Sequence, residues 1–172
     1  MDVNDFVFVD ETGVNIAMAR TYARARKGVR VQASKPYNKG QNITVLGALS
    51  LEGVLAPMTV DGGTDTEVFS TYVKDMLAPA LRTGNVVLMD NLSSHKVEGI
   101  QEAIEAVGAT LEYLPPYSPD LSPIEECWSK VKATLRTQAA RTRDKLDVAM
   151  AYALQLITPE DAKGWFAHCG YV

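Results

Sequence analysis

Two short apolar runs, each followed by an aspartate, limit most strongly how this chain can fold. Residues 6–9 (FVFV) lead into Asp10, and residues 86–89 (VVLM) lead into Asp90. Continuous runs of β-branched and aromatic residues are typical of strands buried on both faces, and open α/β sheets place their sites at the carboxyl ends of such strands. If the two strands are neighbours, the two carboxylates lie together. An aspartate at a strand end is also a common turn former, so neither residue alone establishes a site.

A third carboxylate, Glu125, follows a stretch that is rich in proline, residues 113–130 (YLPPYSPDLSPIEECWSK). Proline fixes φ, so this backbone is held in shape by its own stereochemistry. Ser122 is expected to cap a helix that begins at Pro123. The other prolines of the stretch are Pro115, Pro116 and Pro119, and the apolar face of the helix is expected to consist of Trp128, Val131 and Leu135.

The local pattern leaves two roles open for Glu125. Ser-Pro-Ile-Glu is a capping box, in which a glutamate at the third helical position bonds back to the N-cap amide. The alternative is a carboxylate that the start of the helix delivers into a site at the rigid loop. Taken alone, the pattern favours the cap. Glu126 competes for the second role, but adjacent helical residues point about 100° apart, so only one of the two can face a site.

The remaining elements are expected to surround a mixed sheet. A turn at Gly13 and a short strand near Val14 follow the first strand, and Gly53, with a positive φ, joins a hairpin of residues 43–49 and 54–59. The later strand, helix and strand are expected to form a right-handed parallel unit. The other expected elements are a helix capped by the box at residues 64–67 and reaching residue 77, a helix at 97–107 ended by Gly108, a strand at 110–114, a helix near 145–157, and a helix that starts at Thr158 and Pro159 with Trp165 and Phe166 as core anchors.

Length and composition are those of a single globular domain, residues 1–172, with 47% hydrophobic residues. No apolar run approaches the roughly 20 residues of a membrane span, and the acidic amino terminus lacks the basic region of a signal peptide. We therefore expect a cytoplasmic protein. Cys127 and Cys169 are far apart and form no Cys-x-x-Cys pair, so we expect two buried thiols and neither a zinc site nor a disulfide.

The net charge of −4 disfavours a nucleic-acid partner, but the charges are segregated. Residues 20–39 contain seven basic and no acidic side chains, and a second basic cluster lies within residues 130–145. Such segregation is typical of a phosphate-binding footprint, and a solvated basic loop without a partner is the alternative. Tyr22 and Tyr37 interleave with the first cluster and could stack on bases, although packing is the commoner role. The candidate DNA-binding residues are Arg20, Arg24, Arg26, Lys27, Arg30, Lys35, Lys39, Lys130, Lys132 and Arg136, and the second cluster continues with Arg141, Arg143 and Lys145.

Three motifs give the chain a resemblance to a known family. They are residues 8–13 (FVDETG), residues 89–91 (MDN) with His95 four positions on, and residues 117–125 (YSPDLSPIE). With these motifs the chain, from residue 6 to about residue 136, resembles the catalytic domain of the DDE transposases of the mariner-like superfamily, in its bacterial insertion-sequence branch. The family's acidic triad falls on Asp10, Asp90 and Glu125, and the interval of residues 91–124 is similar to the family's interval.

The resemblance implies an α/β, ribonuclease-H-like fold shared with retroviral integrases. Its central sheet is mixed, the first three strands are antiparallel, and helices cover both faces. It also implies DNA endonuclease and strand-transfer activity, in which water cuts a transposon end and the freed 3′ hydroxyl attacks target DNA. No covalent protein intermediate is implied.

The resemblance also implies two divalent cations per active site, Mg²⁺ or Mn²⁺. Carboxylate oxygens suit these hard cations, and we expect Asp10 to bridge both ions while Asp90 and Glu125 bind one each. Without cations, three converging carboxylates repel, which should raise the pKa of at least one of them. Glu11, Asn91 and His95 are expected to support the site, and the last two could orient a water or the DNA phosphate.

The expected partners are DNA, as transposon ends and target, and a second copy of the chain in a homodimer or higher oligomer. A bacterial protein of this kind would be associated with the nucleoid. Family members carry an amino-terminal helix-turn-helix domain, whereas here the first strand is expected at Phe6. We therefore expect no such domain in this chain, with end recognition left either to a separate amino-terminal DNA-binding polypeptide or to a lost segment.

Two other functions remain open. One is a catalytically inactive transposase remnant that only binds DNA, against which the intact acids argue. The other is a two-carboxylate glycosidase, which is disfavoured because such sites need sugar-stacking aromatic residues and both tryptophans are expected in helices.

Overall fold

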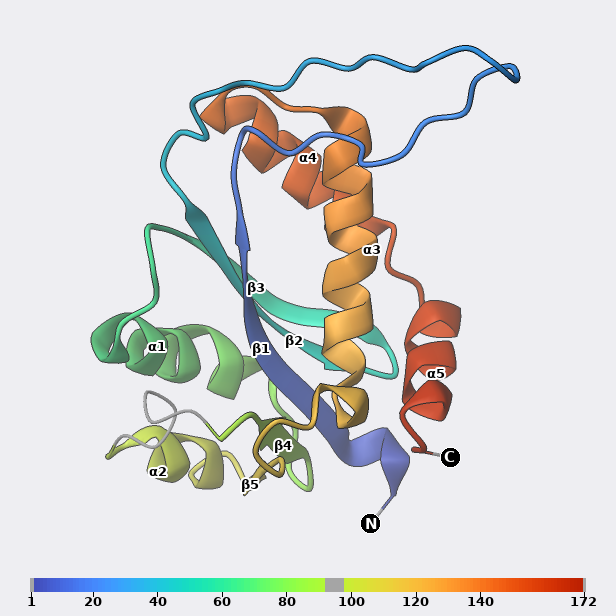
Figure 1. Ribbon diagram of the computed structural model, residues 1–172. Helices are drawn as coiled ribbons and strands as arrows, with labels where there is room; N and C mark the ends of the chain where they lie inside the picture. The colour runs from blue at the N-terminus through green and yellow to red at the C-terminus, as the bar shows by residue number, and fades with distance from the viewer. Residues whose placement is uncertain (1, 92–97, 172) are drawn as a thin grey trace.

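The computed structural model describes residues 2–91 and 98–171, and its core is a five-stranded mixed sheet with helices on both faces (Figure 1). The strand order is β3-β2-β1-β4-β5. The strands are β1 (Phe6–Val14), β2 (Ile43–Ser50), β3 (Gly53–Asp61), β4 (Val86–Met89) and β5 (Thr110–Tyr113). The helices are α1 (Thr66–Tyr72), α2 (Ile100–Glu105), α3 (Pro123–Gln138), α4 (Arg143–Gln155) and α5 (Pro159–His168), with short 3₁₀ turns at Val3–Asp5, Ala78–Ala80 and Pro119–Leu121 and a π-helical turn at Val73–Leu77.

The pairing of the strands confirms the predicted mixed sheet. β1 is antiparallel to β2 and β2 to β3, whereas β1 and β4, and β4 and β5, are parallel. Gly53 joins β2 to β3 with a φ of +123°, as expected for the residue that turns the hairpin. The predicted fold class is therefore confirmed.

Alternate side chains of β1 point into two separate cores, because successive residues of a strand face opposite ways. Phe8 packs with α3, α4 and α5, and its ring meets that of Phe166 edge-on with the centroids 5.2 Å apart. Val7 and Val9 pack on the other face against α1, the π-helical turn and α2. β1 is thus buried on both faces, as its continuous apolar run predicted, and Phe166 is the core anchor expected in the last helix, with Trp165 partly buried beside it.

The predicted turn at Gly13 is wrong, because β1 continues to Val14. Gly13 pairs with Thr44 of β2, so the antiparallel partner extends the strand beyond the end of β4. Asp10 therefore lies inside β1, opposite Gly47, and marks only the end of the pairing with β4. This position holds its backbone more firmly than a strand terminus would.

Some helix boundaries also differ from those predicted. The N-cap of α1 is Asp65, whose side chain accepts a hydrogen bond from the amide of Val68, so the capping box at residues 64–67 is wrong. α2 begins at Ile100, and position 97, where it was predicted to start, lies outside the described residues. Thr142 caps α4, which begins two residues earlier than predicted, and Thr158 caps α5 as predicted.

Of the two cysteines, Cys127 is buried and Cys169 is partly exposed.

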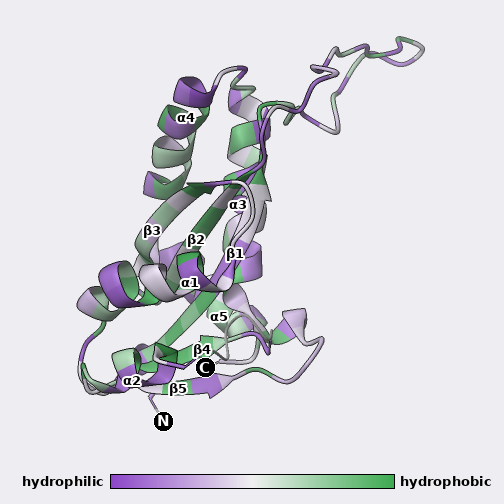
Figure 2. Ribbon diagram, turned by 90° about the vertical axis from the view of Figure 1, so that its left-hand side faces the viewer, coloured by the Kyte–Doolittle hydropathy of each residue, from purple (hydrophilic) through white to green (hydrophobic). Residues whose placement is uncertain are grey.

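Residues 15–42 connect β1 to β2 as a long segment that contains no helix or strand and is mostly exposed, apart from the partly buried residues 15–19 and 36. It carries the first basic cluster and projects beyond the end of the sheet (Figures 1 and 2). Tyr22 and Tyr37 are almost fully exposed, so neither has the packing role that is commoner for such residues. None of the helices described by the structure is long and apolar enough to cross a membrane.

Candidate active site

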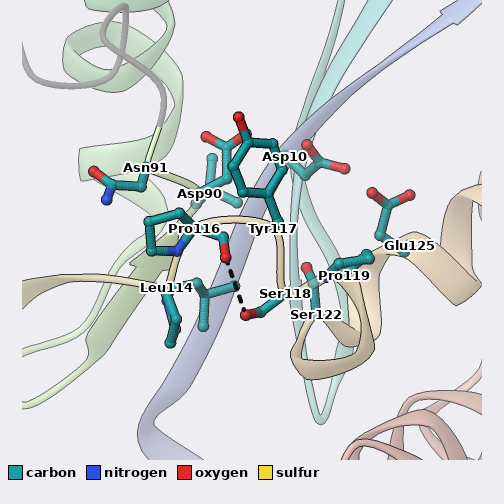
Figure 3. A pocket seen from close by; sticks show the side chains of 12 residues that line it. Asp10, Asp90, Asn91, Leu114, Pro116, Tyr117, Ser118, Pro119, Ser122 and Glu125 are labelled. Atoms are coloured by element: carbon teal, nitrogen blue, oxygen red, sulfur yellow. Dashed lines mark hydrogen bonds between the residues drawn. The ribbon is translucent and has the colours of Figure 1, made fainter.

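A pocket of about 320 Å³ opens where β1, the segment after β4 and the start of α3 meet. Asp10, Asp90 and Glu125 all line it, together with Asn91 and the proline-rich loop before α3. Figure 3 shows the three carboxylates along one side of this pocket, with Asp10 between the other two. The three acidic residues selected from the sequence are therefore brought together by three separate parts of the chain.

The register of β1 and β4 sets the positions of Asp10 and Asp90. The parallel pairing runs from Phe6 opposite Val86 to Val9 opposite Met89. Asp10 directly follows Val9, and Asp90 directly follows Met89. Both aspartates therefore lie just beyond the last β1–β4 pair, next to each other. This is the neighbouring arrangement that the two apolar runs predicted.

Glu125 enters the pocket from the first turn of α3. Ser122 is the N-cap and Pro123 the first helical residue, as predicted. Within the part of the chain that the structure describes, no side-chain capping bond forms at this helix start, so the capping-box role of Glu125 is not realised. Glu126 is also exposed but does not line the pocket, and its charge instead raises the pKa of Cys169, after the larger effect of burial.

The electrostatics of the site centre on Asp10. Burial raises the pKa of Asp10 to about 7, and the negative charges of Glu125 and Asp90 act in the same direction. Hydrogen bonds from the backbone N–H of Glu11 and from the indole of Trp128 oppose this rise. The expected increase in a carboxyl pKa is therefore confirmed for Asp10, with burial as a larger cause than the predicted repulsion.

The donor set suits divalent cations that are held by few protein ligands. No three His, Cys, Asp or Glu side chains among residues 2–91 and 98–171 are grouped closely enough to hold one ion together. Asp10 instead lies near two separate partners, since both Asp90 and Glu125 act on its charge. Magnesium is commonly held by one or two carboxylates while its other positions stay open to water and phosphate oxygens, and an open pocket lined by such pairs fits that chemistry.

The structure places the predicted supporting residues unequally. Asn91 is exposed and lines the pocket, directly after Asp90. Glu11 is partly buried on β1 and does not line the pocket. His95 lies outside the described residues.

The candidate DNA-binding residues divide into three environments. The seven in residues 20–39 are exposed on the long segment. Lys132 and Arg136 are partly buried on α3. Lys130 is bound internally, because its Nζ donates to the carboxylate of Asp161 and to the carbonyl oxygen of Leu156.

Two residues of the site were assigned no such role from the sequence. Trp128 was expected only on the apolar face of α3, yet its Nε1 donates a 3.1 Å hydrogen bond to Oδ2 of Asp10. The spacing of three from Glu125, which puts both on neighbouring helix positions, is the signal that could have indicated it. Tyr117 is fully exposed at the pocket with a φ of +59°, a backbone conformation that is costly for an aromatic residue (Figure 3).

Comparison with known proteins agrees with this geometry. A family model described as DDE superfamily endonuclease matches residues 5–147. A search of curated protein sequences gave no match. Among solved structures, a pre-cleavage Mos1 transpososome is similar with a TM-score of 0.79 at 14% identity, over 98% of this chain and 54% of that one. A Mos1 mariner paired-end complex with Mn has a TM-score of 0.74 at 16% identity, over 98% of this chain and 53% of that one.

The catalytic domain of Mos1 mariner transposase, solved alone, is similar with a TM-score of 0.73 at 14% identity, over 98% of this chain and 79% of that domain. The chain thus spans about half the length of the Mos1 chains in the DNA complexes. At these identities the likeness establishes the fold, which is the ribonuclease-H-like fold of that catalytic domain.

Proposed function

The chain belongs to the DDE superfamily of endonucleases, and from this membership we propose that it is the catalytic core of a transposase. Its reaction is cleavage of DNA phosphodiester bonds followed by transfer of the freed strand. The observation that carries the proposal is the convergence of Asp10, Asp90 and Glu125 on one pocket from three elements. A capping or turn-forming role for each acid would not require them to meet.

We propose that the three carboxylates hold two divalent cations, Mg²⁺ or Mn²⁺. Asp10 lies between the other two acids and would contribute to both ions, while Asp90 and Glu125 would contribute to one each (Figure 3). When bound, such ions activate water and neutralise charge on the attacked phosphate and the leaving oxygen. Support comes from the raised pKa of Asp10, since a cation offsets both the burial of its charge and the repulsion from its neighbours.

The chain's own residues would orient the DNA at this pocket. The pairing of Asp10 with Gly47 in β2 and its position directly after the β4 contact keep its backbone fixed. Asn91, exposed beside Asp90, can donate from its amide to a phosphate oxygen. Tyr117 presents an uncovered ring at the rim, and aromatic rings of this kind stack on unpaired bases.

We propose that DNA also contacts the basic segment, residues 15–42. Seven exposed cations without an intervening acid make a phosphate-binding surface on a chain whose net charge is −4. Its binding should therefore weaken steeply as the salt concentration rises. Two copies of the chain would pair on two DNA ends, and specific recognition of those ends would come from a separate DNA-binding polypeptide.

The test is manganese-dependent nicking of supercoiled plasmid by the purified protein. Asp90→Asn and Glu125→Gln should each abolish nicking while leaving the far-ultraviolet circular dichroism unchanged. Glu126→Gln is the matched control, because it removes a neighbouring charge that does not line the pocket, and it should nick as the unmodified protein does. Nicking retained by Glu125→Gln would remove that residue from the site. DNA binding without nicking by any form would instead indicate a core that needs a separate DNA-binding polypeptide, or an inactive remnant.

A further inference from the structure

Trp128 directs a polar atom from the hydrophobic core onto the central carboxylate of the pocket. The side chain is buried, with 1% of its surface exposed, and it packs in the core between the sheet and α3. Its Nε1 donates a hydrogen bond of 3.1 Å to Oδ2 of Asp10. A buried indole N–H requires an acceptor, and here the acceptor is a carboxylate at the proposed metal site.

The same indole joins two of the elements that carry the site, α3 and β1. Trp128 and Glu125 are three residues apart on α3 and therefore lie on one face of the helix. Because the indole bonds to Asp10 on β1, it fixes the carboxylate of Asp10 relative to the helix that presents Glu125. Because the fused indole ring is rigid, the distance between the α3 backbone at Trp128 and the carboxylate of Asp10 can vary little.

Gly47 provides the space in which the indole lies. It is the residue of β2 directly opposite Asp10. A Cβ atom at Gly47 would lie 2.9 Å from Cη2 of Trp128, which is closer than real Cβ contacts. This glycine is therefore required by the close approach of the ring. The indole of Trp128 therefore contacts Asp10 and also restricts the neighbouring position 47 to glycine.

We propose that Trp128 is a positioning residue for the metal-binding carboxylate of Asp10, with Gly47 as the notch that admits its ring. The proposal rests on the proposed function, in which Asp10 is a metal ligand. Hydrogen-bond partners of metal ligands fix the orientation of those ligands, and losing one typically lowers metal affinity by about 10-fold to 100-fold. Plain core packing would not require the indole N–H at all.

The first test follows the two indole N–H resonances of the ¹⁵N-labelled, unmodified protein. The chain has two tryptophans, so Trp165→Phe assigns both signals. Titration with Mg²⁺ alone should shift the Trp128 resonance along a saturable curve, because the acceptor of its hydrogen bond changes charge environment. The Trp165 resonance should not move. This measurement needs no variant at position 128 and does not depend on nuclease activity.

The second test measures Mn²⁺ affinity by calorimetry. Trp128→Phe keeps an aromatic ring in the core but removes the donor, and it should weaken Mn²⁺ binding by about 10-fold or more. Gly47→Ala should weaken it as well, by displacing the ring. Trp165→Phe is the matched control, because it makes the same chemical change in the same core away from the pocket, and its affinity should equal that of the unmodified protein.

The two ways of failing are distinguishable. If the unmodified protein binds Mn²⁺ but folded Trp128→Phe binds it equally tightly, or if Mg²⁺ leaves the Trp128 resonance unmoved, the positioning role is wrong while the metal site stands. If the unmodified protein shows no heat of Mn²⁺ binding and no thermal stabilisation by either cation, the metal site of the proposed function fails, and the positioning role fails with it.

Discussion

The guanidinium of Arg141 donates a hydrogen bond of 2.8 Å to the carbonyl oxygen of Met18, where the long segment leaves β1. The same nitrogen donates a second bond, of 3.0 Å, to the carbonyl oxygen of Ile16. Arg141 itself lies between α3 and α4, so these bonds tie the base of residues 15–42 to the helical layer. A basic side chain of the second cluster thus holds the segment that carries the first.

Arg141→Ala should loosen this attachment. We expect the free energy of unfolding to fall by about 1–2 kcal/mol, since two carbonyl groups lose a charged donor. Proteolysis within residues 15–42 should become faster. DNA affinity should fall several-fold, because ordering a more mobile segment on binding costs more conformational entropy. Lys145→Ala is the control, as it removes one exposed positive charge from α4. Equal losses of DNA affinity in the two variants would mean that charge alone, and not attachment, is responsible.

Metal-free protein should be less stable at pH 8 than at pH 5. The folded pKa of Asp10, about 7, lies above the ordinary aspartate value of 3.8, so its contribution to stability is fully present below pH 3.8 and is lost as pH rises to about 7. At about 1.4 kcal/mol per pKa unit, the loss is at most a few kcal/mol. Thermal unfolding in a chelator measures it.

Asp10→Asn tests the origin of this pH dependence. The amide carries no charge and can still accept the indole hydrogen bond, so the variant should be more stable than the unmodified protein at pH 8 without metal, and the difference should vanish near pH 4. Millimolar Mg²⁺ should stabilise the unmodified protein but not the variant. If the variant is equally or less stable at pH 8, ionisation of Asp10 does not destabilise the folded protein.

Tyr117→Gly should separate stability from function. The ring is fully exposed and its φ is +59°, so the folded state loses no burial and is relieved of backbone strain, whereas glycine adds freedom to the unfolded chain. These effects oppose each other, and we expect the free energy of unfolding to change by less than about 1 kcal/mol. Plasmid nicking should fall by about 10-fold, as expected for loss of one base-stacking contact. Unchanged nicking would exclude a stacking role for the ring.

Lys130 and Lys132 should behave oppositely, although both were selected from one basic cluster. Lys130 links α3 to the end of α4 and the start of α5, so Lys130→Ala should lower the free energy of unfolding by about 1 kcal/mol with little effect on DNA affinity. Lys132→Ala should lower DNA affinity and leave stability unchanged. Urea unfolding and DNA binding at matched salt decide between them. Similar profiles for the two variants would contradict this assignment.

The parts of the fold that were predictable are those encoded by local pattern. The buried runs of β1 and β4 have continuous apolar sequence, and the start of α3 is marked by Ser122 and Pro123. The extension of β1 through Gly13 was missed because it depends on pairing with β2, which lies about 30 residues away in sequence and is added by tertiary contact. The local pattern at residues 64–67 likewise suggested a box, where Asp65 provides the cap.

The candidate site shows the same limit. Asp10, Asp90 and Glu125, selected from the sequence, line one pocket, but the choice between a cap and a pocket for Glu125 depends on contacts that no local motif contains. The hydrogen bond from Trp128 to Asp10 joins residues separated by 118 positions. The spacing of three from Glu125 places Trp128 near the site, but an apolar helix face does not specify which distant acceptor the indole N–H will reach.

The parallel register between β1 and β4 has a consequence for how this pocket can change during evolution. The hydrogen-bond lattice allows Asp10 and Asp90 to shift past each other only by whole residues, and a shift of one turns the side chain to the opposite face of the sheet. A single insertion or deletion in either run is therefore a loss of the site and never a small adjustment of it. Gradual tuning of the carboxylate spacing has to come from α3, whose start can be re-aimed by its loop without breaking a strand.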